Sequence, residues 1–172
     1  MDDLQLRAEL ERHHASSYAW ALNCCRRDAA EAEDVLQAAY LKVLDGRARY
    51  GGRAAFKTWL LAVIRRTAAD ERRRGWLTKL GLVRRERMAL IAEADPPPEL
   101  AHRTELQAAF QQALAGLPRR QQQVLHLVFY QDLSLSEAAE VLAVSVGSAR
   151  QHYERGKQRL RERMKPWDES NE

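Results

Sequence analysis

The residues from Ser134 to Met164 constrain the fold of this chain more than any other stretch. Ser134 and Glu137 have the S-x-x-E spacing of a capping box, which marks the start of a helix. Apolar residues then recur at helical spacing until Ala143, and Ser145 can cap a second helix. Two capped helices joined by a tight turn predict a helix-turn-helix. Such turns often have Gly where this chain has Ala143, and a left-handed Ala costs about 1–2 kcal/mol.

The second helix of the pair has the residue types of a helix that enters the major groove of DNA. Residues 146–165 contain seven Arg or Lys against two Glu, which suits a phosphate backbone. Arg150 and Arg155 have the forked donors that recognise guanine, and Gln151 can pair with adenine. A solvated basic helix on a helical bundle is the simpler alternative. We rank it second because the caps, the turn and the basic helix occur together in order.

The basic charge of the chain is gathered in two places. The net charge is only +4, yet residues 65–87 hold nine Arg or Lys against three Asp or Glu. Residues 1–34, in contrast, hold eight acidic side chains against four basic ones. Together with the basic helix near the C-terminus, this distribution indicates two separate surfaces that meet a polyanion.

Simpler features exclude several classes of protein. No apolar run approaches the ~18 residues of a membrane span, and the acidic N-terminus lacks the apolar core of a signal peptide, so we expect a cytoplasmic protein.

Cys24 and Cys25 should be reduced in that compartment, and a redox role has little support. The His residues are scattered without metal-ligand spacing, and no catalytic constellation is present. We therefore expect no metal, no cofactor and no enzymatic activity.

Helical periodicity predicts three helices in the first half of the chain, over residues 6–27, 28–44 and 54–74. Strand signals are almost absent, so the expected fold class is all-α. The helix over 28–44 has a core stripe that ends in Tyr40, Val43 and Leu44. Its opposite stripe consists of Asp34, Gln37, Ala38 and Leu41. An outward-facing Leu among polar residues hints at a surface for a partner.

The third of these helices has the composition of a surface for unstacked bases. It follows a loop around Gly51 and Gly52 that carries Arg49, Tyr50 and Arg53. One face of the helix presents Trp59, Arg66, Asp70 and Arg73 at helical spacing. An aromatic side chain beside arginines offers a stacking platform and neutralises phosphates. We expect Trp59 to be a packing residue as well.

Three successive prolines divide the chain. Pro96, Pro97 and Pro98 cannot continue a helix, so we place a linker over residues 92–104, between domains of residues 1–91 and 105–172. Further helices are predicted over 105–115 and 118–130, ahead of the helix-turn-helix. Because the linker has few apolar residues, we expect the two domains to move independently when nothing is bound, and proteolysis to cut there first.

Two small helical domains, each with a basic face, make the chain similar to a known family. From residue 5 to 165 it resembles a bacterial RNA polymerase sigma factor of the sigma-70 family, in the small extracytoplasmic-function (ECF) class. AEDVLQAAYLKVL resembles the region 2 helix that grips the polymerase clamp, and FKTWLLAVIRRTAADERRR resembles the helix that recognises and opens the minus-ten element. The segment from LPRRQQQV to GKQRLR resembles region 4, which reads the minus-35 element.

The resemblance implies partners and residue roles. Core RNA polymerase and promoter DNA would be the partners of a chain that is monomeric when free, and an anti-sigma factor is implied because members are commonly held inactive by one. The residues that would face polymerase are Asp34, Gln37 and Leu41. Tyr50 and Arg53 would lie beside the flipped minus-ten base, and Trp59, Arg66 and Asp70 along the melted strand, on the face that continues to Arg73. The residues that would face the minus-35 major groove are Arg150, Gln151, Glu154 and Arg155.

Three positions depart from the family pattern. Ala38 stands where Glu is usual, and Arg66 where Asn is frequent. Gly156 replaces the usual Ala in the recognition helix, which should loosen that helix by roughly 0.5–1 kcal/mol.

Two other functions are compatible with a C-terminal helix-turn-helix. A dimeric transcriptional regulator would bind a palindrome without polymerase. A DNA-acting enzyme such as a serine recombinase would need a catalytic serine or metal cluster, for which the helical first half offers no clear place. The sigma factor remains the favoured hypothesis.

Overall fold

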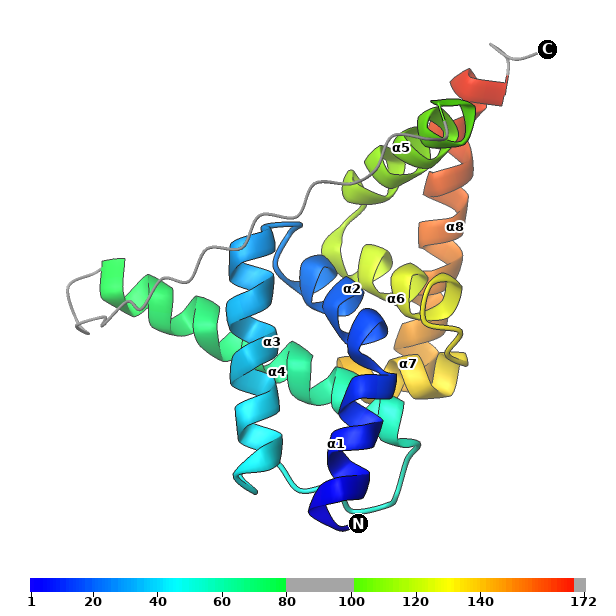
Figure 1. Ribbon diagram of the computed structural model, residues 1–172. Coiled ribbons are helices and arrows are strands. Elements are labelled where there is room, and N and C mark those ends of the chain that lie inside the picture. Colours follow the sequence, from blue (N-terminus) through cyan, green and yellow to red (C-terminus); the bar gives the residue numbers. More distant parts are fainter. Residues whose placement is uncertain (80–100, 169–172) are drawn as a thin grey trace.

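The computed structural model describes residues 1–79 and 101–168, and these residues form helices without any strand (Figure 1). The all-α prediction is therefore confirmed. The helices are α1 (Asp3–Arg12), α2 (His14–Cys24), α3 (Ala29–Leu44), α4 (Phe56–Lys79), α5 (Ala101–Ala115), α6 (Arg119–Phe129), α7 (Leu135–Leu142) and α8 (Val146–Asp168). Within the described ranges, no helix has the length and apolar character needed to cross a bilayer.

Side-chain caps determine where several of these helices begin. The Asp28 carboxylate accepts a hydrogen bond from the Glu31 amide at 2.9 Å and starts α3, as predicted. The single helix expected over residues 6–27 is instead two, α1 and α2, which meet at His13. The His13 amide still donates to the Glu9 carbonyl oxygen at 3.1 Å. Neither a glycine nor a proline marks the break between the two helices, so the sequence pattern did not reveal it.

Helices α2, α3 and α4 pack around a buried tryptophan. Trp20 is fully buried, and its indole Nε1 donates to the Leu61 carbonyl oxygen at 2.9 Å, so the buried polar group is satisfied. Lys42 on α3 forms an ion pair with Asp70 on α4 at 3.2 Å. The prediction that Leu44 belongs to the core was wrong, because this last residue of α3 is 43% exposed.

The helix-turn-helix is present as predicted. The Ser134 hydroxyl accepts from the Glu137 amide, the Glu137 carboxylate accepts from the Ser134 amide, and together they complete the capping box that starts α7. Ala143 ends α7 in the left-handed conformation, with φ 51° and ψ 50°. Ser145 then caps α8 by accepting a hydrogen bond from the Ser148 amide at 3.1 Å.

Gly156 has a packing role that helix propensity does not reveal. A Cβ atom at this position would lie 3.0 Å from Leu125 Cδ1 and 3.3 Å from Gln121 Cβ, both on α6. The propensity cost of glycine therefore accompanies a close crossing of α8 over α6 that a larger side chain would disturb.

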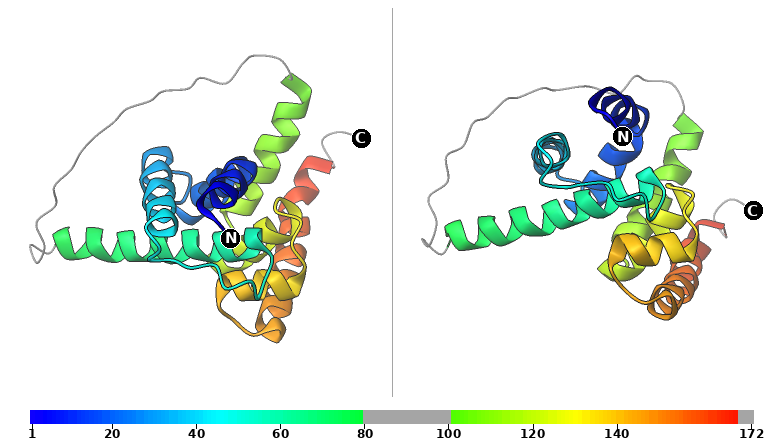
Figure 2. Two further views of the ribbon diagram at one scale, coloured as in Figure 1. Left: turned by 60° about the horizontal axis from the view of Figure 1, so that its bottom comes forward. Right: turned by 90° about the horizontal axis from the view of Figure 1, so that it is seen from below.

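The N-terminal group of helices, α1–α4, is docked against the C-terminal group, α5–α8. In both views of Figure 2, the C-terminal group packs against the first half of α4, while the second half of α4 extends away from it. One cluster of buried side chains continues across the contact, from Trp20 and Leu61 to Val124, Leu127 and Leu142. The two groups therefore share a core.

Polar contacts reinforce this docking. Lys57 donates to the Gln131 carbonyl oxygen at 2.6 Å, and the buried Gln131 amide donates to the Ser16 carbonyl oxygen at 3.1 Å. Arg27 donates to Gln111 at 2.9 Å. The expected independence of the two halves is not what the structure shows, because the composition of a linker carries no information about surfaces that pack together elsewhere. Of the linker expected over 92–104, residues 101–104 belong to α5, and the remainder, prolines included, lies outside the described residues.

Candidate functional site

The outward stripe of α3 borders an apolar hollow. Gln37 and Leu41 line a hollow of about 580 Å³, and Leu41 is 53% exposed. Asp34, which was predicted on the same stripe, is exposed but does not line the hollow. The other lining residues are His14, Tyr18, Glu33, Leu36, Tyr40 and Leu44. This combination of an apolar floor and a polar rim is typical of a protein-binding surface.

The contribution of α2 to this hollow was not predicted. His14 and Tyr18 on α2 lie against α3 in the folded chain, where His14 Nδ1 is 3.3 Å from the Tyr40 hydroxyl. The sequence alone does not reveal this contact between the two helices. The outward-facing Leu41 was the only signal of this surface in the sequence. No described residue of α5–α8 lines the hollow, so docking of the two helix groups leaves it open.

The loop before α4 holds an aromatic cluster beside arginines. The Tyr50 ring lies with its centroid 5.3 Å from those of both Phe56 and Trp59, and its hydroxyl donates to the Ala54 carbonyl oxygen at 2.6 Å. Tyr50, Arg53 and Trp59 share a hollow of about 450 Å³ with Arg49. Trp59 is half-buried, so its ring packs against the core and is also partly exposed at the surface, as expected.

The remaining predicted residues of α4 lie farther along the helix, outside this hollow. Arg66 and Arg73 follow Trp59 by seven and fourteen residues, or about 10 and 21 Å at 1.5 Å per residue. Both arginines are exposed. The Asp70 carboxylate is bound by Lys42, which also donates to the Thr67 hydroxyl at 3.2 Å. Asp70 thus joins α4 to α3, while the arginines carry the positive charge of this face.

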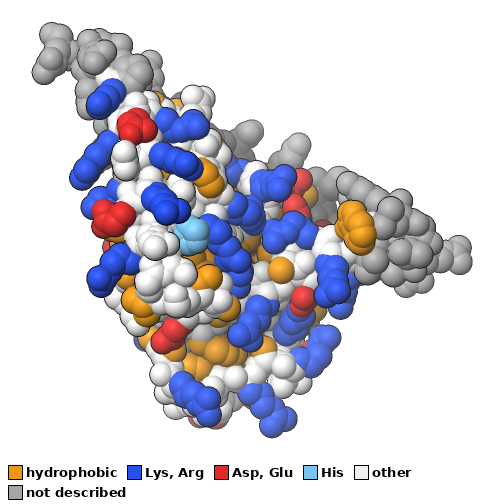
Figure 3. Space-filling model, turned by 180° about the vertical axis from the view of Figure 1, so that it is seen from behind, with side chains coloured by type: hydrophobic (Ala, Val, Ile, Leu, Met, Phe, Trp, Pro, Cys, Tyr) orange, Lys and Arg blue, Asp and Glu red, His pale blue; other side chains and the backbone are white. Residues whose placement is uncertain are grey.

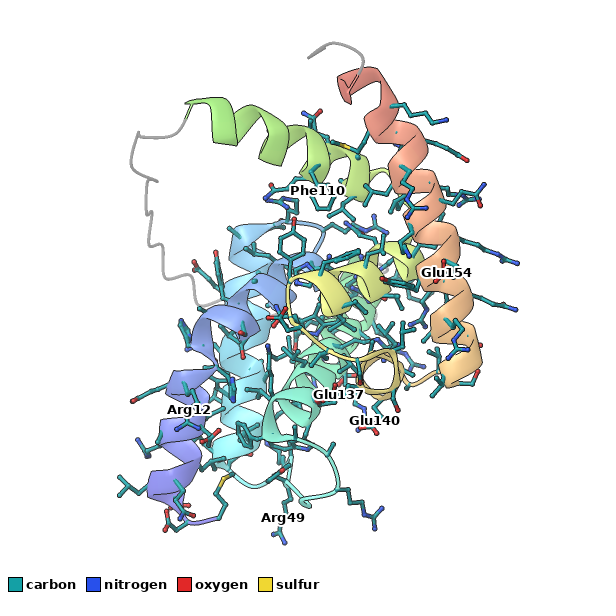
Figure 4. All side chains as sticks on the ribbon, turned by 90° about the vertical axis from the view of Figure 1, so that its right-hand side faces the viewer. Arg12, Arg49, Phe110, Glu137, Glu140 and Glu154 are labelled. Atoms are coloured by element: carbon teal, nitrogen blue, oxygen red, sulfur yellow. The ribbon has the colours of Figure 1, made fainter. Side chains whose placement is uncertain are left out.

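Helix α7 lies against the same part of α4. Glu140 lines the hollow of Tyr50 and Trp59, and the Thr58 hydroxyl donates to Glu137 at 3.4 Å. In Figure 4, Glu137 and Glu140 lie on α7 above the loop that carries Arg49. Docking therefore adds a carboxylate to a hollow whose other charged residues are arginines.

The outer face of α8 is polar and open. Arg150, Gln151 and Arg155 are exposed, while Ala149, Gly156 and Leu160 are buried on the inner side. The Glu154 carboxylate lies 3.9 Å from Lys157 Nζ, so it is partly engaged within its own helix (Figure 4). Two forked cations and an amide near the start of the second helix match the requirements for reading base edges.

The two cysteines are buried. Burial raises the pKa of both Cys24 and Cys25 to about 12, so each thiol is protonated at neutral pH and lacks the thiolate that redox chemistry requires. Among the described residues, no group of His, Cys, Asp and Glu side chains is arranged to hold a metal ion.

Comparison with known proteins identifies the family. Residues 10–78 match Sigma-70 region 2, and residues 113–162 match Sigma-70 region 4. The chain is 31% identical to the ECF RNA polymerase sigma factor SigX of Bacillus subtilis, over 80% of this chain and 73% of that protein. It is 28% identical to the ECF RNA polymerase sigma factor SigE of Mycolicibacterium smegmatis, over 90% of this chain and 60% of that protein.

Solved structures share the fold. The sigma factor RpoE of Bartonella quintana, in complex with the anti-sigma factor NepR, matches 94% of this chain and 97% of its own, with a TM-score of 0.68 at 21% identity. CnrH, in complex with the cytosolic domain of CnrY, matches 96% of this chain and 90% of its own, with a TM-score of 0.65 at 20% identity. The chain belongs to the sigma-70 family of transcription initiation factors, and within it to the ECF RNA polymerase sigma factors.

Proposed function

We propose that this ECF sigma factor binds core RNA polymerase through the α3 hollow and its rim, contacts the minus-ten element through the α4 loop and helix, and reads the minus-35 element through α8. The observation that carries the proposal is the match, residue by residue, between three exposed surfaces and the three motifs of the sequence. Asp34, Gln37 and Leu41 are exposed on α3, Tyr50 and Trp59 share one hollow, and Arg150, Gln151 and Arg155 are exposed on α8.

Each of the two helix groups has its own proposed binding surfaces. Residues 1–91 hold the polymerase and minus-ten surfaces, residues 105–172 hold the minus-35 surface, and the linker over 92–104 overlaps the first turn of α5. The chain acts in the cytoplasm as a monomer when free, and it catalyses no reaction itself. Its two groups must separate on the promoter, because Glu140 of α7 lines the hollow that the minus-ten strand would enter.

An anti-sigma factor would hold the chain in its docked form. Support comes from the fold, which is shared with the sigma factor RpoE in its complex with the anti-sigma factor NepR, and with CnrH in its complex with the cytosolic domain of CnrY. A partner of this kind needs only to prefer the docked arrangement over the separated one in order to shift the population.

Transcription by purified components tests the proposed function. Core polymerase with this chain should start transcription at a defined promoter, and core polymerase alone should not. Gel filtration and a mobility-shift assay separate the alternative, because a helix-turn-helix regulator would elute as a dimer and shift a palindromic site without polymerase. A shift that is unchanged by omitting polymerase would reject the proposed function.

A further inference from the structure

Four arginines from the two helix groups line one small hollow at their contact. Arg65 and Arg72 come from α4, and Arg119 and Arg120 come from α6. The hollow has a volume of about 230 Å³, and its remaining lining residues are Cys24, Ala69 and Gln123. It lies apart from the hollow that contains Tyr50 and from the one that contains Leu41, since it shares no lining residue with either. None of the proposed functions uses it.

The guanidinium groups are held by the ends of two helices. Arg72 donates to the Cys24 carbonyl oxygen at the end of α2 at 2.9 Å, and Arg119 donates to the same oxygen. Arg65 and Arg120 donate, each at 3.5 Å, to the Val141 and Leu142 carbonyl oxygens at the end of α7. The carbonyls of a last helical turn have no partner within the helix, which explains why cations gather there.

These contacts leave most of the positive charge without compensation. A helix C-terminus carries about half a negative charge, so two of them offset about one of the four positive charges and leave about three. Within the part of the chain that the structure describes, none of the four arginines forms an ion pair. Burial, followed by the neighbouring charges of Arg120, Arg66 and Arg72, lowers the pKa of Arg65. Burial and the charge of Arg72 likewise lower that of Arg119.

Docking therefore brings like charges together around a space that is not filled by side chains. Figure 3 shows that Lys and Arg side chains predominate on the rear face of the molecule. The mutual repulsion of these four charges opposes closure of the two groups, and a negative charge that enters the hollow would offset it. The planar fork of arginine suits phosphate oxygens in particular.

We propose that this hollow binds a small phosphorylated anion, such as a free polyphosphate or the polyphosphate chain of a nucleotide, and that the bound anion stabilises the docked form. A volume of about 230 Å³ equals roughly seven or eight water molecules at ~30 Å³ each, which is enough for two or three phosphate groups and far too little for duplex DNA. Because α4 and α6 each supply two of the four cations, the complete site exists only while the groups are docked. The anion would thus oppose the separation that the proposed promoter binding requires, and this regulatory consequence rests on that proposed function.

Titration calorimetry of the full chain with sodium tripolyphosphate tests the site. At physiological ionic strength we expect saturable binding of one anion per chain, while sodium sulfate at matched ionic strength binds at least about tenfold more weakly, because fewer guanidinium groups reach it. Replacing two arginines from different groups, Arg72→Gln with Arg119→Gln, should weaken binding by about a hundredfold, taking roughly tenfold for each charge-assisted contact. The matched control, Arg7→Gln with Arg12→Gln, removes the same charge from two exposed positions on α1 and should bind within about twofold of the wild type.

A second variant and a second readout keep the test decisive. Arg120→Gln removes an exposed side chain whose contact with Leu142 is long, so it should fold normally and still weaken tripolyphosphate binding about tenfold. Energy transfer between dyes placed on α3 and α8 should show that tripolyphosphate raises the docked fraction of the wild type. An absence of binding, or equal losses in the site and control variants, would overturn the inference. Short DNA that competes fully with tripolyphosphate for the hollow would also overturn it, by assigning the arginines to a nucleic-acid backbone.

The two proposals fail separately. Both anion measurements omit polymerase and promoter, so a chain that initiates transcription but binds no tripolyphosphate contradicts the anion site alone. A chain that binds tripolyphosphate but does not initiate transcription supports the site and contradicts the proposed function.

Discussion

The imidazole ring of His126 on α6 lies against the indole ring of Trp20 on α2, with their centroids 5.4 Å apart. The Tyr130 ring stacks on the same imidazole, with its centroid 5.2 Å from that of His126. Burial, with a smaller contribution from the charge of Arg27, lowers the pKa of His126 to about 4. The neutral imidazole is therefore the form that the docked arrangement accepts.

Acidification should separate the two helix groups. In the separated state His126 regains a pKa near 6.5, so that state binds more protons than the docked one between about pH 6.5 and 4. The contribution of His126 to the stability of the docked form is complete above pH 6.5 and is lost as the pH falls toward 4. Allowing for partial solvent screening, we expect a loss on the order of 2 kcal/mol. Energy transfer between the groups, measured against pH, should fall over this window, and His126→Phe should flatten the profile.

Ala143→Gly should stabilise the chain. The residue is exposed and left-handed, with φ 51°, and glycine adopts this conformation without a Cβ penalty. After the entropic cost of glycine is subtracted, we expect a gain of about 0.5–1 kcal/mol in the free energy of unfolding. Denaturant titration measures it. Ala8→Gly, at an exposed position inside α1, is the control and should destabilise by a similar amount.

Asp34→Arg combined with Leu41→Glu should abolish capture of core polymerase. Both side chains are exposed beside or within the α3 hollow, so the double variant should keep its fold while losing the charge and the apolar contact of the patch. A pull-down with immobilised core polymerase checks the effect. Leu4→Glu, at an even more exposed leucine on α1, should be captured normally. Normal capture of the folded double variant would reject the patch.

The arginines of α8 should divide into two kinds. Arg150→Ala or Arg155→Ala should cost about 1–3 kcal/mol at one position of the minus-35 element and relax specificity there. Arg161→Ala, farther along the helix, should weaken all sequences alike and lower the salt dependence by about one phosphate contact. Holoenzyme binding to single-base promoter variants at several salt concentrations distinguishes them. Uniform losses from all three substitutions would mean that α8 holds DNA without reading it.

Local signals allowed most of the helices, but not their mutual contacts, to be predicted. The caps formed by Asp28 and by Ser134 with Glu137 act on residues one turn away, so sequence spacing revealed them. The left-handed conformation of Ala143 was not predicted, because alanine adopts it only at a cost. The bend at His13 has no comparable marker. The hydrogen bond from Gln131 to Ser16 and the proximity of Arg72 to Arg119 join residues that are far apart in the chain. Helical periodicity carries no information about such pairs. The same reason hid His14 and Tyr18 from the predicted polymerase patch.

The open position of the α3 hollow has a consequence for how a holoenzyme would assemble. Since no described residue of α5–α8 covers it, polymerase could capture the chain while the two groups are still docked. Every later contact of the C-terminal group would then be intramolecular, because both groups belong to one chain, and would need no second collision. Residence time on polymerase, rather than collision frequency, would decide whether a captured chain opens before it dissociates.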